Sequence, residues 1–79
     1  SKRSLDRGME NLKEIVCLGL RRGDVVAQCS ASQYVVMLLQ ANYADSCMVC
    51  QRVIRSFHRR YPHAHLEITA VVQPLEPTL

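Results

Sequence analysis

Aromatic residues are scarce in this chain of 79 residues, which has no tryptophan, one phenylalanine and three tyrosines. Its hydrophobic share is nevertheless 48%, so the core must be built mainly from aliphatic side chains, methionine and cysteine. Scarce rings argue against a surface that stacks single-stranded nucleic acid. The formal net charge of +3 falls short of the strongly basic balance of an independent nucleic-acid-binding domain. We therefore expect DNA to be contacted only by other domains of a longer protein.

Long apolar runs and glycine-rich loops are lacking as well. No stretch of about 18 apolar residues is available to cross a membrane, and no signal-peptide pattern is seen, so we expect a cytoplasmic location and no membrane partner. With three glycines in all, the chain has no loop that would cradle phosphates. Asp24 and Glu67 are not spaced as a catalytic pair, and no Cys and His spacing singles out a nucleophile with its base. The sequence predicts no enzymatic activity and no cofactor.

Periodic patterns predict five elements in the order α-β-β-α-β. Helices are expected over about residues 4–20 and 43–61, and strands over about 25–29, 33–40 and 66–73. Ser4 is the predicted N-cap of the first helix, and Pro62 is the stop signal of the second. The unbroken apolar run over residues 34–39 predicts a well-buried central strand.

The chain divides into a short polar start, one small domain and a tail. We place the start at residues 1–4, the domain at 5–73 and the tail at 74–79. Pro74 and Pro77 end the ladder bonding of the last predicted strand. A core of this size contributes only roughly 3–5 kcal/mol of net stability, which favours oligomerisation as a supplement.

The predicted hairpin and the order of elements resemble the GGDEF (diguanylate cyclase) family. The five motif positions are held here by Ser30, Ala31, Ser32, Gln33 and Tyr34. A Cβ stands where the family's glycines let backbone approach a nucleotide, and neutral side chains replace the acidic pair that holds the metal. The resemblance implies a noncatalytic domain without a bound metal.

For the fold, the resemblance implies a truncated ferredoxin-like domain of the α+β class, an antiparallel sheet with two helices on one face. The family's first strand, which is central in that sheet, has no counterpart over residues 5–73. An unfilled place in a sheet is a route to association. We therefore expect a homodimer, with the central strand supplied either by a partner chain or by residues beyond those given.

Two longer segments narrow the resemblance to the C-terminal domain of clostridial-type SARP regulators, which carry a bacterial transcriptional activator domain. They are LRRGDVVAQCSASQYVVML and FHRRYPHAHLEITAVVQPLEP. The shared positions are Ser30, Ser32, Gln33, Tyr34 and 73–77. The resemblance implies a noncatalytic regulatory or dimerisation domain of a bacterial transcriptional regulator. An active diguanylate cyclase is the least favoured alternative.

Arg21 and Asp24 form an Arg-x-x-Asp pattern, and five residues separate Asp24 from Ser30. In GGDEF proteins a pattern at this place is an inhibitory site for cyclic di-GMP, so the resemblance implies a cyclic di-GMP receptor as the second hypothesis. A guanidinium can grip phosphate, and a carboxylate can accept from a guanine edge. The structural alternative is that the arginine favours the helix end while Gly23 and Asp24 make a turn.

Two further groups have a plain structural interpretation. Cys47 and Cys50 lie three apart on the second predicted helix, but packing in its apolar stripe explains them, and a zinc site would need His58, His63 or His65 as well. We expect no metal site and reduced thiols. A basic stripe on the same helix is interpreted as its solvated face. The functional alternatives are contact with phosphate or with an acidic protein surface, and a protein partner is favoured over DNA. The stripe consists of Arg52, Arg55, Arg59 and Arg60.

Overall fold

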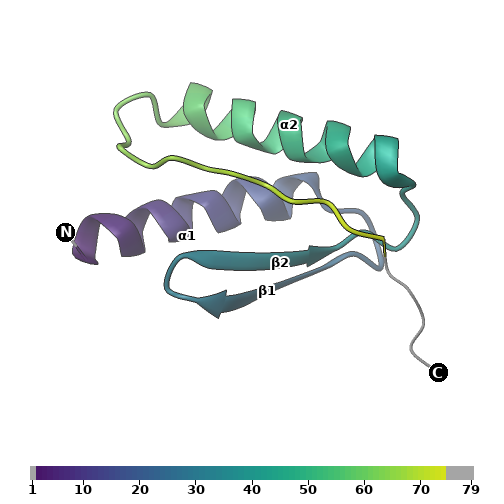
Figure 1. The fold of residues 1–79 in the computed structure, drawn as a ribbon. Coiled ribbons are helices and arrows are strands. Elements are labelled where there is room, and N and C mark those ends of the chain that lie inside the picture. Colours follow the sequence, from purple (N-terminus) through teal and green to yellow (C-terminus); the bar gives the residue numbers. More distant parts are fainter. Residues whose placement is uncertain (1, 75–79) are drawn as a thin grey trace.

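The computed structural model describes residues 2–74 and contains two helices and one hairpin (Figure 1). The elements are α1 (Lys2–Gly19), β1 (Val25–Ser30), β2 (Gln33–Met37) and α2 (Tyr43–Arg60). Both helices lie to one side of the hairpin, which confirms the predicted α+β class at this coarse level. Most of the predicted tail, residues 75–79, lies outside the described residues.

Helix α1 begins earlier than predicted and is followed by a glycine turn. It starts at Lys2, so Ser4 lies inside the helix and its assignment as N-cap is wrong. Lysine and arginine are good helix formers, which is why the first turn extends before Ser4. After the helix, Gly23 takes a φ of 94°, a conformation that a side chain would strain. The turn leads directly into β1.

Strands β1 and β2 form an antiparallel hairpin with one irregularity. Val26 pairs with Val36 and Gln28 with Tyr34, and the register then shifts between Gln28 and Ser30. Cys29 is the extra residue at this bulge, which disrupts the β1 side of the ladder. The bulge and the tight turn together set where the hairpin reverses.

The core is small and lies between the two helices. Among the described residues the buried hydrophobic side chains are Met9, Val16 and Phe57, and Phe57 has no exposed surface. The amphipathic stripes of α1 and α2 meet here, as the sequence patterns predict. A hydrogen bond of 2.9 Å from the Tyr34 hydroxyl to the Met9 carbonyl joins β2 to α1.

Strand β2 is not the buried central strand that the apolar run predicts. It ends at Met37 instead of near residue 40, and Val35, Val36 and Met37 are 44%, 36% and 38% exposed. The physical reason is that β2 has one neighbour, β1, in a sheet of two strands. The uninterrupted apolar run of β2 indicated a strand buried between two neighbours. Among the described residues, however, no strand pairs with the edge of β2 that faces away from β1.

The last predicted strand is absent from the described residues, so the order is α-β-β-α. Residues 66–73 keep most of the side-chain alternation of a strand: Leu66, Ile68 and Val72 are half-buried and Glu67 is exposed, although Ala70 on the same face as Leu66 is exposed as well. Within the part of the chain described, no backbone hydrogen bond joins this segment to another. A strand is defined by its ladder, and the neighbour that would form one is missing.

Segment 66–73 nevertheless packs against α1, the helix to which β2 is hydrogen-bonded through Tyr34. A Cβ placed on Gly8 would come within 3.2 Å of Leu66 Cδ2, so the absence of a side chain allows this close approach. The neighbouring residue, Met9, accepts the bond from Tyr34. The segment and β2 thus meet α1 at adjacent positions, and both run in the same direction along the molecule (Figure 1).

Candidate functional site

The five motif positions lie at the tip of the hairpin and at the start of β2. Within the turn, the Ser30 hydroxyl accepts a bond of 3.2 Å from the Ser32 amide, and the Gln28 side-chain amide donates to the Ser30 carbonyl at 3.0 Å. Ser30, Ala31, Ser32 and Gln33 are exposed. Short polar side chains thus close a turn through bonds to backbone groups.

Tyr34, the fifth position, connects the hairpin to the helices. Its hydroxyl donates to the Met9 carbonyl at 2.9 Å. Burial is the largest of the effects that raise the pKa of Tyr34 above 10.0, followed by the negative charges of Glu10 and Cys17. The hydroxyl is therefore held protonated, as a donor in this position must be.

The Arg21 and Asp24 pair forms part of the turn between α1 and β1. The Asp24 carboxylate accepts from the Arg21 amide through Oδ2 at 2.9 Å and from the Leu39 amide through Oδ1 at 3.2 Å. The Asp24 amide in turn donates to the Arg21 carbonyl at 3.0 Å. Each carboxylate oxygen therefore already accepts a backbone amide, while the Arg21 side chain is exposed.

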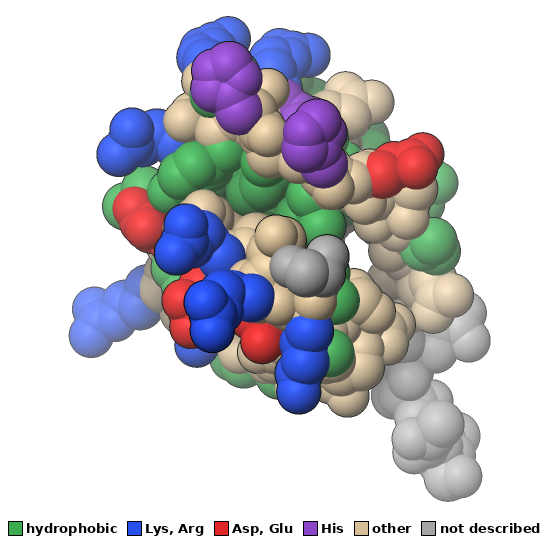
Figure 2. Space-filling view, turned by 90° about the vertical axis from the view of Figure 1, so that its left-hand side faces the viewer, with side chains coloured by type: hydrophobic (Ala, Val, Ile, Leu, Met, Phe, Trp, Pro, Cys, Tyr) green, Lys and Arg blue, Asp and Glu red, His purple; other side chains and the backbone are tan. Residues whose placement is uncertain are grey.

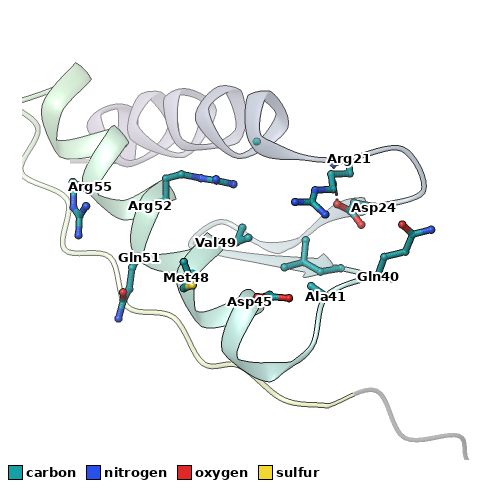
Figure 3. A pocket seen from close by; sticks show the side chains of 12 residues that line it. Arg21, Asp24, Gln40, Ala41, Asp45, Met48, Val49, Gln51, Arg52 and Arg55 are labelled. Carbon is teal, nitrogen blue, oxygen red and sulfur yellow. Dashed lines mark hydrogen bonds between the residues drawn. The ribbon is translucent and has the colours of Figure 1, made fainter.

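A hollow of about 460 Å³ adjoins this turn and extends to α2. We call it the arginine hollow, after Arg21, Arg52 and Arg55, which line it together with Asp24 and Asp45. The Arg21 and Arg52 side chains point toward one another, one from the turn and one from α2 (Figure 3). The structure thus brings the predicted ligand pair next to half of the predicted basic stripe.

The rest of the basic stripe lies elsewhere. The Arg60 guanidinium stands 5.6 Å from the centre of the Tyr61 ring, at the C-terminal end of α2. Figure 2 shows basic side chains and histidines at the end of the molecule where α1 begins and α2 ends, with hydrophobic side chains visible between them. The stripe is therefore divided between two surfaces.

The Cys47 and Cys50 pair is half-buried on α2, and both are free thiols, as are the exposed Cys17 and Cys29. Burial is the main cause that raises the pKa of Cys50 above 9.0, and Cys47 adds to it. Among residues 2–74, no group of three or more metal-ligating side chains comes together. The pair has the environment of inert, partly buried thiols.

One positioning residue escaped the sequence analysis. Asn42 is the N-cap of α2, and its side-chain oxygen accepts a bond of 2.8 Å from the Asp45 amide. The signal was present, because Asn42 followed three residues later by an acidic side chain marks a helix start. This cap sets where α2 begins and so positions Asp45 at the arginine hollow.

Comparisons with protein-family models, with curated proteins and with solved structures find no match to this chain. Among the described residues, neither helix is long and apolar enough to cross a bilayer.

Proposed function

We propose that this chain is a noncatalytic regulatory domain that dimerises through the outer edge of β2. The observation that carries the proposal is that, within residues 2–74, β2 has β1 as its one strand partner. Backbone donors and acceptors on the other side of an edge strand are a template for a further strand. A second copy presents the same edge, so a two-fold axis would join two hairpins into a four-stranded antiparallel sheet.

The composition of β2 favours association, because the usual protections of an edge strand are missing. Natural edge strands carry a charged residue, a proline or a bulge that blocks a new neighbour. The five residues of β2, QYVVM, include no charge and no proline, and Val35, Val36 and Met37 are at least one-third exposed. Strand β1, by contrast, carries the bulge at Cys29. The β2 edge is therefore the one that we assign to the dimer.

Stability also favours a partner. A lone two-stranded hairpin is marginal in water, and the buried core of the described residues consists of Met9, Val16 and Phe57. Val36 shares a face with Tyr34, which contacts α1, yet 36% of Val36 remains exposed. A strand added beside β2 would cover part of this surface and contribute roughly 25 cal/mol for each Å² of apolar surface removed from water.

The noncatalytic part of the proposal rests on the hairpin tip. Ser30 and Ala31 place side chains where a nucleotide would need bare backbone, and Ser32 and Gln33 lack the charge that holds a divalent cation. The role in a bacterial transcriptional regulator rests on the resemblance of the hairpin and of residues 73–77, with DNA contacted by other domains. Binding of promoter DNA by the full-length protein, weakened when this domain is removed, would support that role.

Sedimentation velocity over a range of concentrations tests the dimer with a matched pair of variants. Val35→Lys places a charge on β2, and Val25→Lys places the same charge on the same face of β1, at a site 46% exposed. We expect the unaltered chain to dimerise, Val35→Lys to weaken the dimer at least tenfold and Val25→Lys to leave it intact. A monomer at all concentrations, or equal weakening by both variants, would refute pairing through the β2 edge.

Cyclic di-GMP binding through Arg21 and Asp24 is the second candidate. The observation that favours it is that the Arg21 guanidinium faces a hollow with a second arginine, Arg52, opposite. The hydrogen bonds that the Asp24 carboxylate accepts from the Arg21 and Leu39 amides weigh against a ligand role for that carboxylate. Calorimetric titration with cyclic di-GMP decides it, since no heat at high ligand concentration removes this candidate.

A further inference from the structure

We propose that the end of the molecule where α1 begins and α2 ends binds an acidic, amphipathic segment of another protein. We call this surface the basic end, and it consists of residues 2–8 of α1 together with residues 57–67. It shares no residue with β2 or with the lining of the arginine hollow. The proposal therefore depends neither on dimerisation nor on a nucleotide ligand.

Two segments that are far apart in the sequence form the basic end. The helices run in opposite directions, so the start of α1 and the end of α2 lie at the same end of the molecule (Figure 1). A Cβ added to Gly8 would come within 3.2 Å of Leu66 Cδ2, which places the residues after α2 directly against the second turn of α1. The charged side chains of the two segments are therefore neighbours.

The formal net charge of the chain is concentrated at this end. The basic end holds five of the ten Lys and Arg residues but only two of the seven Asp and Glu residues, so it carries the whole formal charge of +3. All three histidines lie here too. An acidic partner is therefore attracted to this end of the molecule. The basic residues are Lys2, Arg3, Arg7, Arg59 and Arg60, and the acidic ones are Asp6 and Glu67.

These basic side chains are available to a partner. All five are exposed, and within residues 2–74 none of their charged groups forms an ion pair. The Arg60 guanidinium stands 5.6 Å from the centre of the Tyr61 ring. The Tyr61 hydroxyl forms no hydrogen bond within the same part of the chain, so it is a further donor for a carboxylate beside the arginines.

Helix stability accounts for only one of the two groups of charges. His58, Arg59 and Arg60 lie in the last turn of α2, where positive charge complements the helix dipole. Lys2 and Arg3 lie instead in the first turn of α1, which contains no acidic side chain. Basic side chains at that end of a helix face the positive end of its dipole, which is unfavourable. A role in binding accounts for charges that the helix itself does not need.

Apolar surface between the charges favours a protein segment over nucleic acid. Leu5, Tyr61 and Leu66 are half-buried, and Figure 2 shows hydrophobic side chains between the basic ones. Apolar side chains of a partner would cover this surface while its carboxylates pair with the guanidiniums. Single-stranded nucleic acid would instead need aromatic rings for stacking, and only 5% of the residues are aromatic.

Fluorescence anisotropy with labelled probes and the whole chain tests the proposal. The probes are a peptide of Glu, Asp and Leu, the same peptide with Ser in place of Leu, and a double-stranded DNA of random sequence. One double variant combines Arg7→Gln with Arg59→Gln. Its matched control combines Arg21→Gln with Arg22→Gln, which removes the same charge from exposed positions beyond the opposite end of α1. Circular dichroism of both variants checks that the helices are retained.

We expect saturable binding of the leucine-containing peptide and a loss of about tenfold or more in affinity when Arg7 and Arg59 are replaced. The control should stay within about twofold in about 0.1 M salt, because charges more than about 10 Å apart are then largely screened. Equal losses in the two double variants would show nonspecific attraction and overturn the site, as would anisotropy that does not saturate.

The other two probes test the class of partner. We expect the peptide without leucine to bind more weakly, because it cannot cover the apolar surface. Equal affinity for the two peptides would overturn the amphipathic class. DNA that binds more tightly than the leucine-containing peptide, with the same dependence on Arg7 and Arg59, would assign the basic end to nucleic acid and overturn the protein partner.

Discussion

The Asp24 carboxylate accepts a hydrogen bond of 3.2 Å from the Leu39 amide, fifteen positions further along the chain. Its other oxygen accepts from the Arg21 amide at 2.9 Å. One side chain thus ties the turn after α1 to the residues that follow β2. This relationship fixes the hairpin against the end of α1 and forms one side of the arginine hollow.

We predict that Asp24→Ala lowers the free energy of unfolding by about 1–3 kcal/mol, because two backbone amides lose their acceptor. Asp24 is only half-buried, so water replaces part of the loss and the lower half of that range is expected. Urea denaturation monitored by circular dichroism measures it. Glu67→Ala, at an exposed position, is the control, and equal midpoints for the two variants would contradict the structural role of Asp24.

Tyr34→Phe is expected to cost about 0.5–1.5 kcal/mol, the net contribution of one hydrogen bond. The ring remains, and only the donor to the Met9 carbonyl is removed. Tyr61→Phe is the matched control at another half-buried tyrosine. If urea denaturation finds Tyr34→Phe as stable as the unaltered chain, the link between hairpin and α1 contributes nothing.

The same tyrosine predicts a loss of stability in alkali. Its pKa in the folded chain is raised above 10.0, so between these two pKa values the folded state binds more protons than the unfolded state. The contribution of Tyr34 is therefore complete below about pH 10 and declines as the pH rises through the folded pKa. Urea denaturation between pH 8 and pH 11 should show a decline that is shallower in Tyr34→Phe. Identical slopes would contradict this assignment.

The thiols should react with an alkylating reagent in a definite order. Cys17 and Cys29 are exposed, whereas Cys50 is half-buried and its pKa is raised above 9.0, chiefly by burial. The thiolate is the reactive form, so Cys50 is expected to be slower than Cys17 by about tenfold or more at pH 7.5. Peptide mass spectrometry after timed iodoacetamide treatment measures the order. Fast modification of Cys50 would indicate an activated thiol instead.

Much of the fold could be predicted from periodicity. The amphipathic stripes placed both helices to within a few residues, and the β-branched runs placed the hairpin. The errors came from context. The apolar run of β2 indicated a buried strand, but burial of β2 requires a second neighbouring strand, which residues 2–74 do not supply. The alternation of residues 66–73 predicts an apolar side of a strand, but it does not provide the partner strand with which the backbone would form hydrogen bonds.

Individual residues of the candidate site could be predicted from the sequence, but their arrangement in space could not. The pattern Arg21-x-x-Asp24 was visible, but its spacing does not reveal that Leu39 occupies one oxygen of the carboxylate. Arg52 and Arg55 appeared as a solvated helix face, since their meeting with Arg21 depends on how α2 packs. Contacts between distant segments are set by tertiary packing, which local patterns do not encode.

Backbone amide hydrogen exchange of β2, followed over increasing protein concentration, tests the proposed association most directly. In an edge strand the amides that do not bond to the neighbour point outward. We predict that the outward amides of residues 33–37 exchange rapidly in dilute solution and become protected as the concentration rises. Rapid exchange of these amides at every concentration would contradict pairing through the β2 edge.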